Sequence, residues 1–359
     1  MAVFWTNLVI VFTFSLFARY TGKPADLDPI ALKPNKVFAF LALASLVLVS
    51  GLRSNIGDTG TYMRSYTLLG TDLDKALNNA DFGFNLLIVI LNTISENPQL
   101  LIFVTALITN ILILKVIYNY ADPFELGTFL YITTGSYVVS MNGIRQFLAS
   151  AVIFAAVKWL IEGNWKRYFV IVALASVIHL SALIMIPVYF VVRQKAWSRM
   201  TIAIILLTII IFIFFEPFFF SLFEVMGDNQ YAHYKDYLAQ SGLGANFIRT
   251  IIAAVPLLLA FAGRNRLRDF WPNTDYIVNL SMINFIFMLF ATINWIFARF
   301  SIYFGLYNFL LLPWIIKHVF HQESKKIMYF SLVICYFVFY YYENVLSLGI
   351  KYRSSYLNF

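Results

Sequence analysis

The chain has 359 residues, of which 61% are hydrophobic and only 12% are charged. Soluble domains carry about 25% charged residues, so this composition excludes a soluble globular protein and predicts a polytopic membrane protein. The net charge of +8 does not indicate nucleic-acid binding, because lysine and arginine mainly set the orientation of membrane proteins. The single cysteine, Cys335, excludes an intrachain disulfide and a thiolate metal site.

Apolar runs predict an all-α integral membrane protein with about ten transmembrane helices in a single domain, 1–359. The first run lacks the basic segment and cleavage site of a signal peptide, so it is interpreted as a retained span. Two outer loops are expected, at 53–97, which includes an amphipathic helix at 82–94, and at 223–246. The predicted spans are 2–18, 37–52, 98–118, 126–141, 146–161, 201–222, 247–263, 276–298, 300–316 and 327–342.

The distribution of basic residues predicts the orientation. Four of them follow the first span, which places that loop in the cytoplasm and the N-terminus outside. A single crossing by 169–192 would then put the basic residues of the C-terminal half outside. An even number of crossings would keep those basic residues in the cytoplasm, where short basic loops normally lie. However, this segment is too short for two spans of about 20 residues each. We therefore predict a short re-entrant or tilted helical hairpin at 169–192, with His179 near its tip and the C-terminus also outside.

Arginines from separate spans are predicted to lie together at the outer face. Arg53, Arg145 and Arg299 each adjoin an apolar run, and Arg64 and Arg249 are additional candidates. An isolated arginine at membrane depth is unfavourable, and a bound polyanion would relieve that cost. Because the guanidinium fork suits phosphate oxygens, we predict that Arg53, Arg145, Arg299 and Arg64 bind a polyanion that carries phosphate. The alternative is that each arginine pairs with an acid or a lipid headgroup.

Two side chains are candidates for a general base. Asp58 is close in sequence to an arginine, although aspartate between glycines is also typical of a simple turn. His179 is better suited to neutral pH, and its alternative is a hydrogen-bonded core histidine. Tyr62, Gln146 and Tyr234 are predicted to contact saccharide, whereas anchoring at the membrane interface is the alternative for the tyrosines.

The sequence predicts no metal and no cofactor. Asp72-Leu73-Asp74 matches the D-x-D pattern of metal-dependent glycosyl transfer, but Asp26-Leu27-Asp28 matches equally well on the predicted cytoplasmic side. No glycine-rich phosphate loop or dinucleotide motif occurs. This favours a substrate that carries its own leaving group in the membrane over a cytosolic nucleotide.

Three short motifs, in this order and spacing, resemble the EpsG family of exopolysaccharide proteins: Gly51–Tyr62, Asn142–Gln146 and Ile178–Leu183. The resemblance implies a Wzy-like polymerase in the cell membrane, with a polytopic bundle like that of the GT-C-like lipid-dependent glycosyltransferases. It would join oligosaccharide repeat units carried on undecaprenyl diphosphate, at an outward-facing site and without a metal, during formation of a biofilm matrix. The resemblance thus implies that Arg53, Arg145, Arg299 and Arg64 bind this diphosphate. The implied partners are that lipid-linked oligosaccharide, membrane lipid and other exopolysaccharide assembly and export proteins, and no nucleic acid.

Two alternatives come from other functional classes. A flippase for lipid-linked sugars predicts repeated halves with sites at the membrane midplane, and no inverted repeat is visible in the sequence. A non-catalytic scaffold of the exopolysaccharide machinery would tolerate the loss of Arg145 or Asp58 with full polymer output.

Overall fold

The computed structural model describes residues 1–359 except 28, 79–80, 214–243 and 358–359. In the described part the all-α prediction is confirmed, because the only sheet there is a short antiparallel pair, β1 (Lys23–Leu27) and β2 (Ile30–Lys33). The predicted outer loop at 223–246 lies almost entirely outside the described residues, and so does Tyr234.

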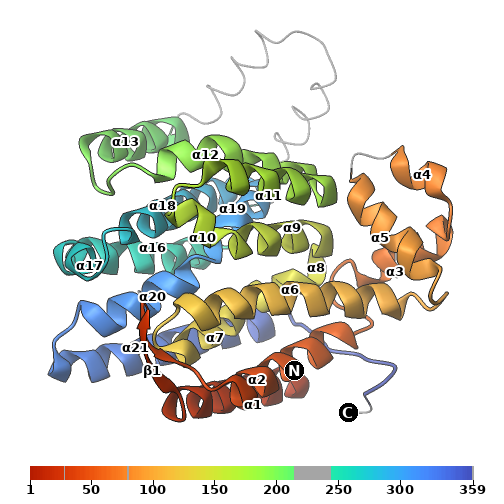
Figure 1. The fold of residues 1–359 in the computed structure, drawn as a ribbon, viewed down its shortest axis with the longest axis horizontal. Helices are drawn as coiled ribbons and strands as arrows, with labels where there is room; N and C mark the ends of the chain where they lie inside the picture. Colours follow the sequence, from red (N-terminus) through yellow and green to blue (C-terminus); the bar gives the residue numbers. More distant parts are fainter. Residues whose placement is uncertain (28, 79–80, 214–243, 358–359) are drawn as a thin grey trace, which may run out of the picture.

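Helices account for nearly all the remaining elements (Figure 1). The N-terminal half contains α1 (Ala2–Tyr20), α2 (Lys36–Gly51), α3 (Thr59–Leu69), α4 (Leu73–Leu77), α5 (Phe82–Asn92), α6 (Gln99–Tyr120), α7 (Phe124–Thr133), α8 (Ser136–Asn142), α9 (Ile144–Ala155) and α10 (Val157–Ile161). The C-terminal half contains α11 (Trp165–Ile178), the 3₁₀ helix η1 (Leu180–Ile184), α12 (Met185–Val192), α13 (Arg199–Ile213), α16 (Phe247–Ala262), α17 (Arg264–Phe270), α18 (Thr274–Ala291), α19 (Ile296–Gly305), α20 (Asn308–His318), α21 (Gln322–Tyr341) and the π-helical turn η2 (Tyr342–Ser347).

Several helices are long and apolar enough to cross a membrane, as expected for a multi-pass membrane protein. Among the described residues, four helices qualify: α1, α6, α18, and α21 together with η2. The count rises to six if the pairs α16–α17, bent by 76°, and α19–α20, bent by 51°, each form one span. The prediction of about ten spans is not confirmed, because other apolar runs form shorter or broken helices. The run 126–141, for example, divides into α7 and α8 at Gly135, which has a positive φ of 84°.

The core lies around α7 and α20. All ten residues of α7 are buried, and α20 is buried from Asn308 to Ile316. Trp314 of α20 is fully buried, and its indole N–H donates to the carbonyl of Tyr120 at 2.7 Å. A helix that is apolar on all sides belongs at the centre of a bundle. The peripheral helices α13 and α21 instead expose large apolar side chains, such as Leu206 and Phe330, which suits contact with lipid.

The helices run side by side, roughly horizontally in Figure 1, so their polar connections gather at two ends. One end, here called the basic end, holds the ion pairs Arg19–Glu125, Lys317–Asp122 and Arg268–Asp275. The opposite end, here called the site end, includes α3, α4 and α5. The basic side chains at the site end include Arg53, Arg145, Arg249, Arg299, Lys351 and Arg353.

Residues 169–192 do not form one continuous helix. α11 ends at Ile178, where His179 has an extended backbone with φ −154° and ψ 116°. The chain returns through η1 and α12, and the rings of Phe169 and Tyr189 pack 5.3 Å apart. The side chain of Arg193 donates to the carbonyl of Leu160 at 2.7 Å. The start of α11 and the end of α12 therefore both lie at the basic end. His179 is therefore presented toward the site end.

The C-terminal tail after η2 packs against the segment that follows α2. The backbone N–H of Ser54 donates to the carbonyl of Arg353 at 2.9 Å. The side-chain amide of Asn55 donates to the carbonyl of Lys351 at 2.7 Å. These contacts fix the tail across the site end.

Candidate functional site

The turn between α8 and α9 connects most of the predicted site residues. It has the sequence Met-Asn-Gly-Ile-Arg-Gln, in which Gly143 ends α8 and precedes the first turn of α9. Each of four residues in this turn contacts a different part of the site end. The contacts are Met141 with Arg53, Asn142 with Asp58, Arg145 with Asp81, and Gln146 with Arg299.

Arg53 is buried beneath this turn, with only 1% of its surface exposed. Its guanidinium donates to the carbonyl of Met141 at 2.9 Å, to the hydroxyl of Thr59 at 3.1 Å and to the carbonyl of Ser50. Burial lowers the pKa of Arg53 to about 10, which leaves the group charged at neutral pH. None of the described carboxylates forms an ion pair with it, so backbone carbonyls stabilise this cation.

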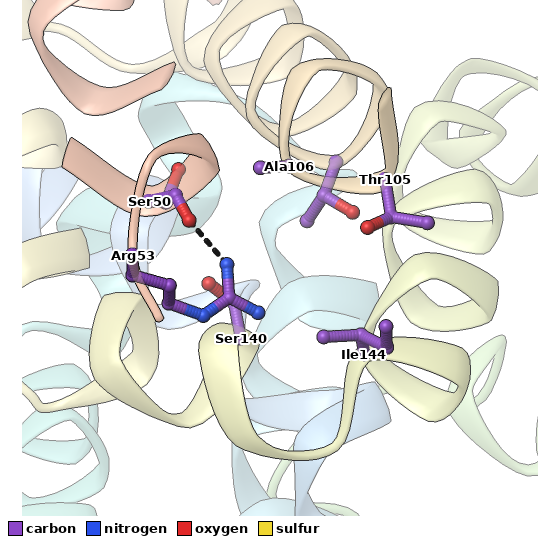
Figure 2. A pocket seen from close by; sticks show the side chains of 7 residues that line it. Ser50, Arg53, Thr105, Ala106, Ser140 and Ile144 are labelled. Atoms are coloured by element: carbon purple, nitrogen blue, oxygen red, sulfur yellow. Dashed lines mark hydrogen bonds between the residues drawn. The ribbon is translucent and has the colours of Figure 1, made fainter. Parts of the chain in front are cut away.

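A small cavity lies against the Arg53 guanidinium (Figure 2). Its volume of about 10 Å³ is close to the minimum needed by one water molecule. Ser50, Thr105 and Ser140 contribute hydroxyl groups to its wall. Arg53 therefore occupies an enclosed polar site with no room for a diphosphate.

A second group, here called the Arg145 cluster, consists of Asp81, Arg145 and His179. The carboxylate of Asp81 accepts a hydrogen bond from Arg145 at 3.1 Å and lies 3.1 Å from Nδ1 of His179. It also accepts the backbone N–H of Leu180 at 3.3 Å. Asp81 is 8% exposed, so this one carboxylate joins the start of α5, the start of α9 and the end of α11.

Aromatic rings cover the other side of the Arg145 cluster. The guanidinium carbon of Arg145 lies 5.7 Å from the ring centre of Tyr62 and 5.9 Å from that of Phe84. The two rings pack edge to face at 5.9 Å. Tyr62 is thus buried against an arginine and a phenylalanine.

Asp81 was missed by the reasoning from sequence, although a signal for it existed. The outer arginines oppose the orientation rule, which requires a nearby compensating group. The segment 53–97 contains few acids, and Asp81 directly precedes an apolar helix. Asp81 is therefore one of a small number of candidate partners for Arg145 in that segment.

Asp58 and Arg64 lie apart from these two groups. Asp58 is exposed immediately before α3, and its backbone N–H donates to the side chain of Asn142 at 3.0 Å. Its carboxylate makes no hydrogen bond to the N-terminus of α3. Arg64 is exposed on α3. The structure thus places Asp58 beside the α8–α9 turn and leaves Arg64 on the surface.

A large cavity of about 1090 Å³ opens at the site end. Its described wall is formed by the segment after α2, by α8, α9, α16, α18, α19, α20 and α21, and by η2 and the C-terminal tail. Four of the described side chains in this wall are basic: Arg249, Arg299, Lys351 and Arg353. Side-chain amides are also abundant in it, from Asn55, Asn142, Gln146, Asn246, Asn284, Asn308 and Asn344. Cations and neutral amides together suit a ligand that has both phosphate and sugar hydroxyl groups.

Arg299 and Gln146 meet at the wall of this cavity. The side-chain amide of Gln146 donates to the backbone carbonyl of Arg299 at 2.9 Å. The guanidinium carbon of Arg299 lies 4.9 Å from the ring centre of Trp295, which also lines the cavity. Arg299 is exposed, so its charge is available to a ligand.

The three principal arginines do not share one pocket. Arg53 faces the small cavity, Arg145 faces Asp81, and Arg299 lines the large cavity. The α8–α9 turn connects them: Met141 contacts Arg53, Arg145 belongs to the turn, and Gln146 contacts Arg299. Arg249, Lys351 and Arg353 are the cations that the cavity adds to Arg299.

The EpsG family model matches residues 36–356, nearly the whole chain. No curated protein and no solved structure matches the chain.

Proposed function

The chain belongs to the EpsG family, and from this premise we propose that it polymerises undecaprenyl-diphosphate-linked oligosaccharide repeat units of an exopolysaccharide. Membership of the family agrees with a polymerase-like role in exopolysaccharide synthesis. The observation that carries the proposal is the cavity of about 1090 Å³ with four basic side chains in the described part of its wall. Its volume is at the upper limit of ordinary small-molecule pockets, as a substrate of several sugars requires.

We propose that the site end faces outward. The basic end carries most of the lysines and arginines in short connections, among them Lys36, Lys166, Lys195, Arg264 and Lys326. Such connections stay in the cytoplasm, which supports a cytoplasmic basic end. Phe4 packs against Tyr352 at 5.6 Å, so both termini lie at the site end and would be outside the cell.

The proposed reaction is direct glycosyl transfer. A hydroxyl at the non-reducing end of the acceptor forms a bond to the anomeric carbon of the donor chain. The bond from that carbon to the diphosphate oxygen breaks, and its electron pair leaves with the polyprenyl diphosphate. This leaving group needs positive charge more than a proton, which Arg299, Lys351 and Arg353 would supply. Removal of one well-placed donor from such a site costs about 3–4 kcal/mol of transition-state stabilisation.

The Arg145 cluster lies next to the cavity and has a supporting role in the proposal. By holding Arg145, Asp81 fixes the start of α9, and the adjacent Gln146 lines the cavity. His179 keeps its candidacy as a base, since the carboxylate at Nδ1 would orient the ring and leave Nε2 available. Neither His179 nor Asp58 is among the described residues that line the cavity. Alanine substitution of each tests both assignments.

The decisive experiment uses purified protein in lipid nanodiscs with synthetic undecaprenyl-diphosphate-linked repeat units, and scores chain length over time. We expect products several repeats long, and the release of one undecaprenyl diphosphate for each bond formed. Arg299→Ala should lose most of this activity, whereas Lys326→Ala at the basic end should retain it. A flippase or a scaffold would give no lengthening with the wild-type protein, and that result would refute the proposal.

A further inference from the structure

Glu343 is an unusual residue in the wall of the large cavity. It lies in the π-helical turn η2, at the end of α21, and is only 3% exposed. π-helical turns occur frequently at functional sites, because they displace a side chain from the regular helical position. Among the described residues that line the cavity, Glu343 is the only one with a carboxyl group.

One oxygen of the carboxylate is held by Arg249. Nε of Arg249 donates to Oε1 of Glu343 at 2.7 Å, and Nη2 donates to the same oxygen. The adjacent Tyr342 receives a hydrogen bond at 2.8 Å from Asn246, which also caps α16. The start of α16 and the η2 turn are therefore fixed to each other at this position.

The other oxygen of Glu343, Oε2, is buried and has no hydrogen-bond partner among the described residues. A buried polar atom without a partner is unfavourable, and in a native protein it calls for an explanation such as a catalytic role or a bound water or ion. Because Arg249 stabilises the charge and occupies only Oε1, Oε2 remains able to accept a proton. A sugar hydroxyl in the cavity is a suitable donor to it.

We propose that Glu343 is the general base that activates the acceptor hydroxyl, and that Arg249 holds it in place. This inference rests on the proposed function. As the acceptor oxygen bonds to the anomeric carbon, its proton passes to Oε2 of Glu343, and the electron pair of the breaking bond leaves with the diphosphate. The proton later passes to water. Arg249 is a positioning residue, whereas Glu343 contacts the reacting hydroxyl.

Glu343→Gln tests the proposal, because glutamine keeps the shape and removes the base. A positioned base contributes about 10²–10⁴-fold, so we expect the polymerisation rate to fall at least 100-fold at saturating substrate while donor binding is retained. Glu125→Gln is a matched control. Glu125 is also buried and paired with an arginine, and its Oε2 also lacks a described partner, but it lies at the basic end. The control should keep its catalytic rate.

A second variant distinguishes chemistry from structural support. Glu343→Ala leaves space for formate, which should restore part of the rate if a carboxylate acts as the base. The proposal fails if Glu343→Gln polymerises at the wild-type rate, or if formate does not restore folded Glu343→Ala. If neither variant folds, Glu343→Asp decides, since a purely structural ion pair predicts a near wild-type rate and a base predicts a large loss.

The same assay separates this inference from the proposed function. Lack of chain lengthening by the wild-type protein refutes the proposed function. Lengthening that survives Glu343→Gln refutes only the assignment of Glu343. His179→Ala and Asp58→Ala are measured alongside, and a larger loss of rate in either of them than in Glu343→Gln also overturns the assignment.

Discussion

Replacing Gly57 with alanine would disturb the contact between the segment after α2 and the α8–α9 turn. Gly57 has a positive φ of 50°, a conformation that costs an L-residue about 1–2 kcal/mol. A Cβ at this position would lie 2.2 Å from Oδ1 of Asn142, so Asn142 would have to move. That oxygen accepts the backbone N–H of Asp58 at 3.0 Å.

The backbone strain at position 57 and the loss of the hydrogen bond to Asn142 together should lower the free energy of unfolding measurably. The lost hydrogen bond contributes about 1 kcal/mol, and with the backbone strain the expected cost of Gly57→Ala is about 2–3 kcal/mol. Two other glycines separate the contributions. Gly135 lies in the left-handed helical region, with φ 84° and ψ −6°, and has nothing within 4 Å of an added Cβ, so Gly135→Ala should show the strain alone. Gly60 lies in α3 with free space around it, so Gly60→Ala should be neutral or slightly stabilising.

The free energy of unfolding is measured by titration with SDS in mixed micelles, and polymerisation is measured in parallel. We expect Gly60→Ala to be the most stable variant, followed by Gly135→Ala and then Gly57→Ala. Adding Asn142→Ala should cause no further loss in the Gly57→Ala background. The reasoning is refuted if Gly57→Ala costs no more than Gly135→Ala, or if its effect and that of Asn142→Ala are additive.

Three further results are expected. Arg145→Ala should abolish polymer in cells, while lipid-linked single repeats and the protein level persist. Arg145→Lys should restore little polymer, because lysine lacks the planar guanidinium fork. Normal polymer in the alanine variant would contradict the proposed role of Arg145. Arg299→Ala should raise the KM for the donor more than Lys326→Ala does, and equal KM values argue against the cavity as the diphosphate site. In a Cys335→Ser background, the Arg64→Cys variant should react with an impermeant maleimide on intact cells. The Lys326→Cys variant should react only after the cells are permeabilised. The reverse labelling pattern would show that the proposed membrane orientation is wrong.

The sequence located the helices because apolar runs are a strong local signal. It did not locate their interruptions, since Gly135 lies within a run that remains apolar on both sides. Length alone therefore predicted a span at 126–141 where two shorter helices form.

Residues of the candidate site could be predicted from the sequence where a charged side chain interrupts or adjoins an apolar run. Arg53, Arg145 and Arg299 each interrupt or adjoin an apolar run, and each makes a polar contact at the site end. Asp81 and Glu343 were not found, because their significance depends on partners 64 and 94 positions away in sequence. Such pairing is a property of the folded chain and has no local pattern.

The position of the C-terminal tail has a consequence for biogenesis. Lys351 and Arg353 complete the cavity wall, and they hydrogen-bond to the segment next to α2, nearly 300 residues earlier. The wall therefore cannot be finished until the chain has been translated past Arg353 and α21 has been inserted. A chain that ends before Lys351 would lack two of the four cations in the described part of the wall, so under the proposed function it would bind the diphosphate of the lipid carrier weakly.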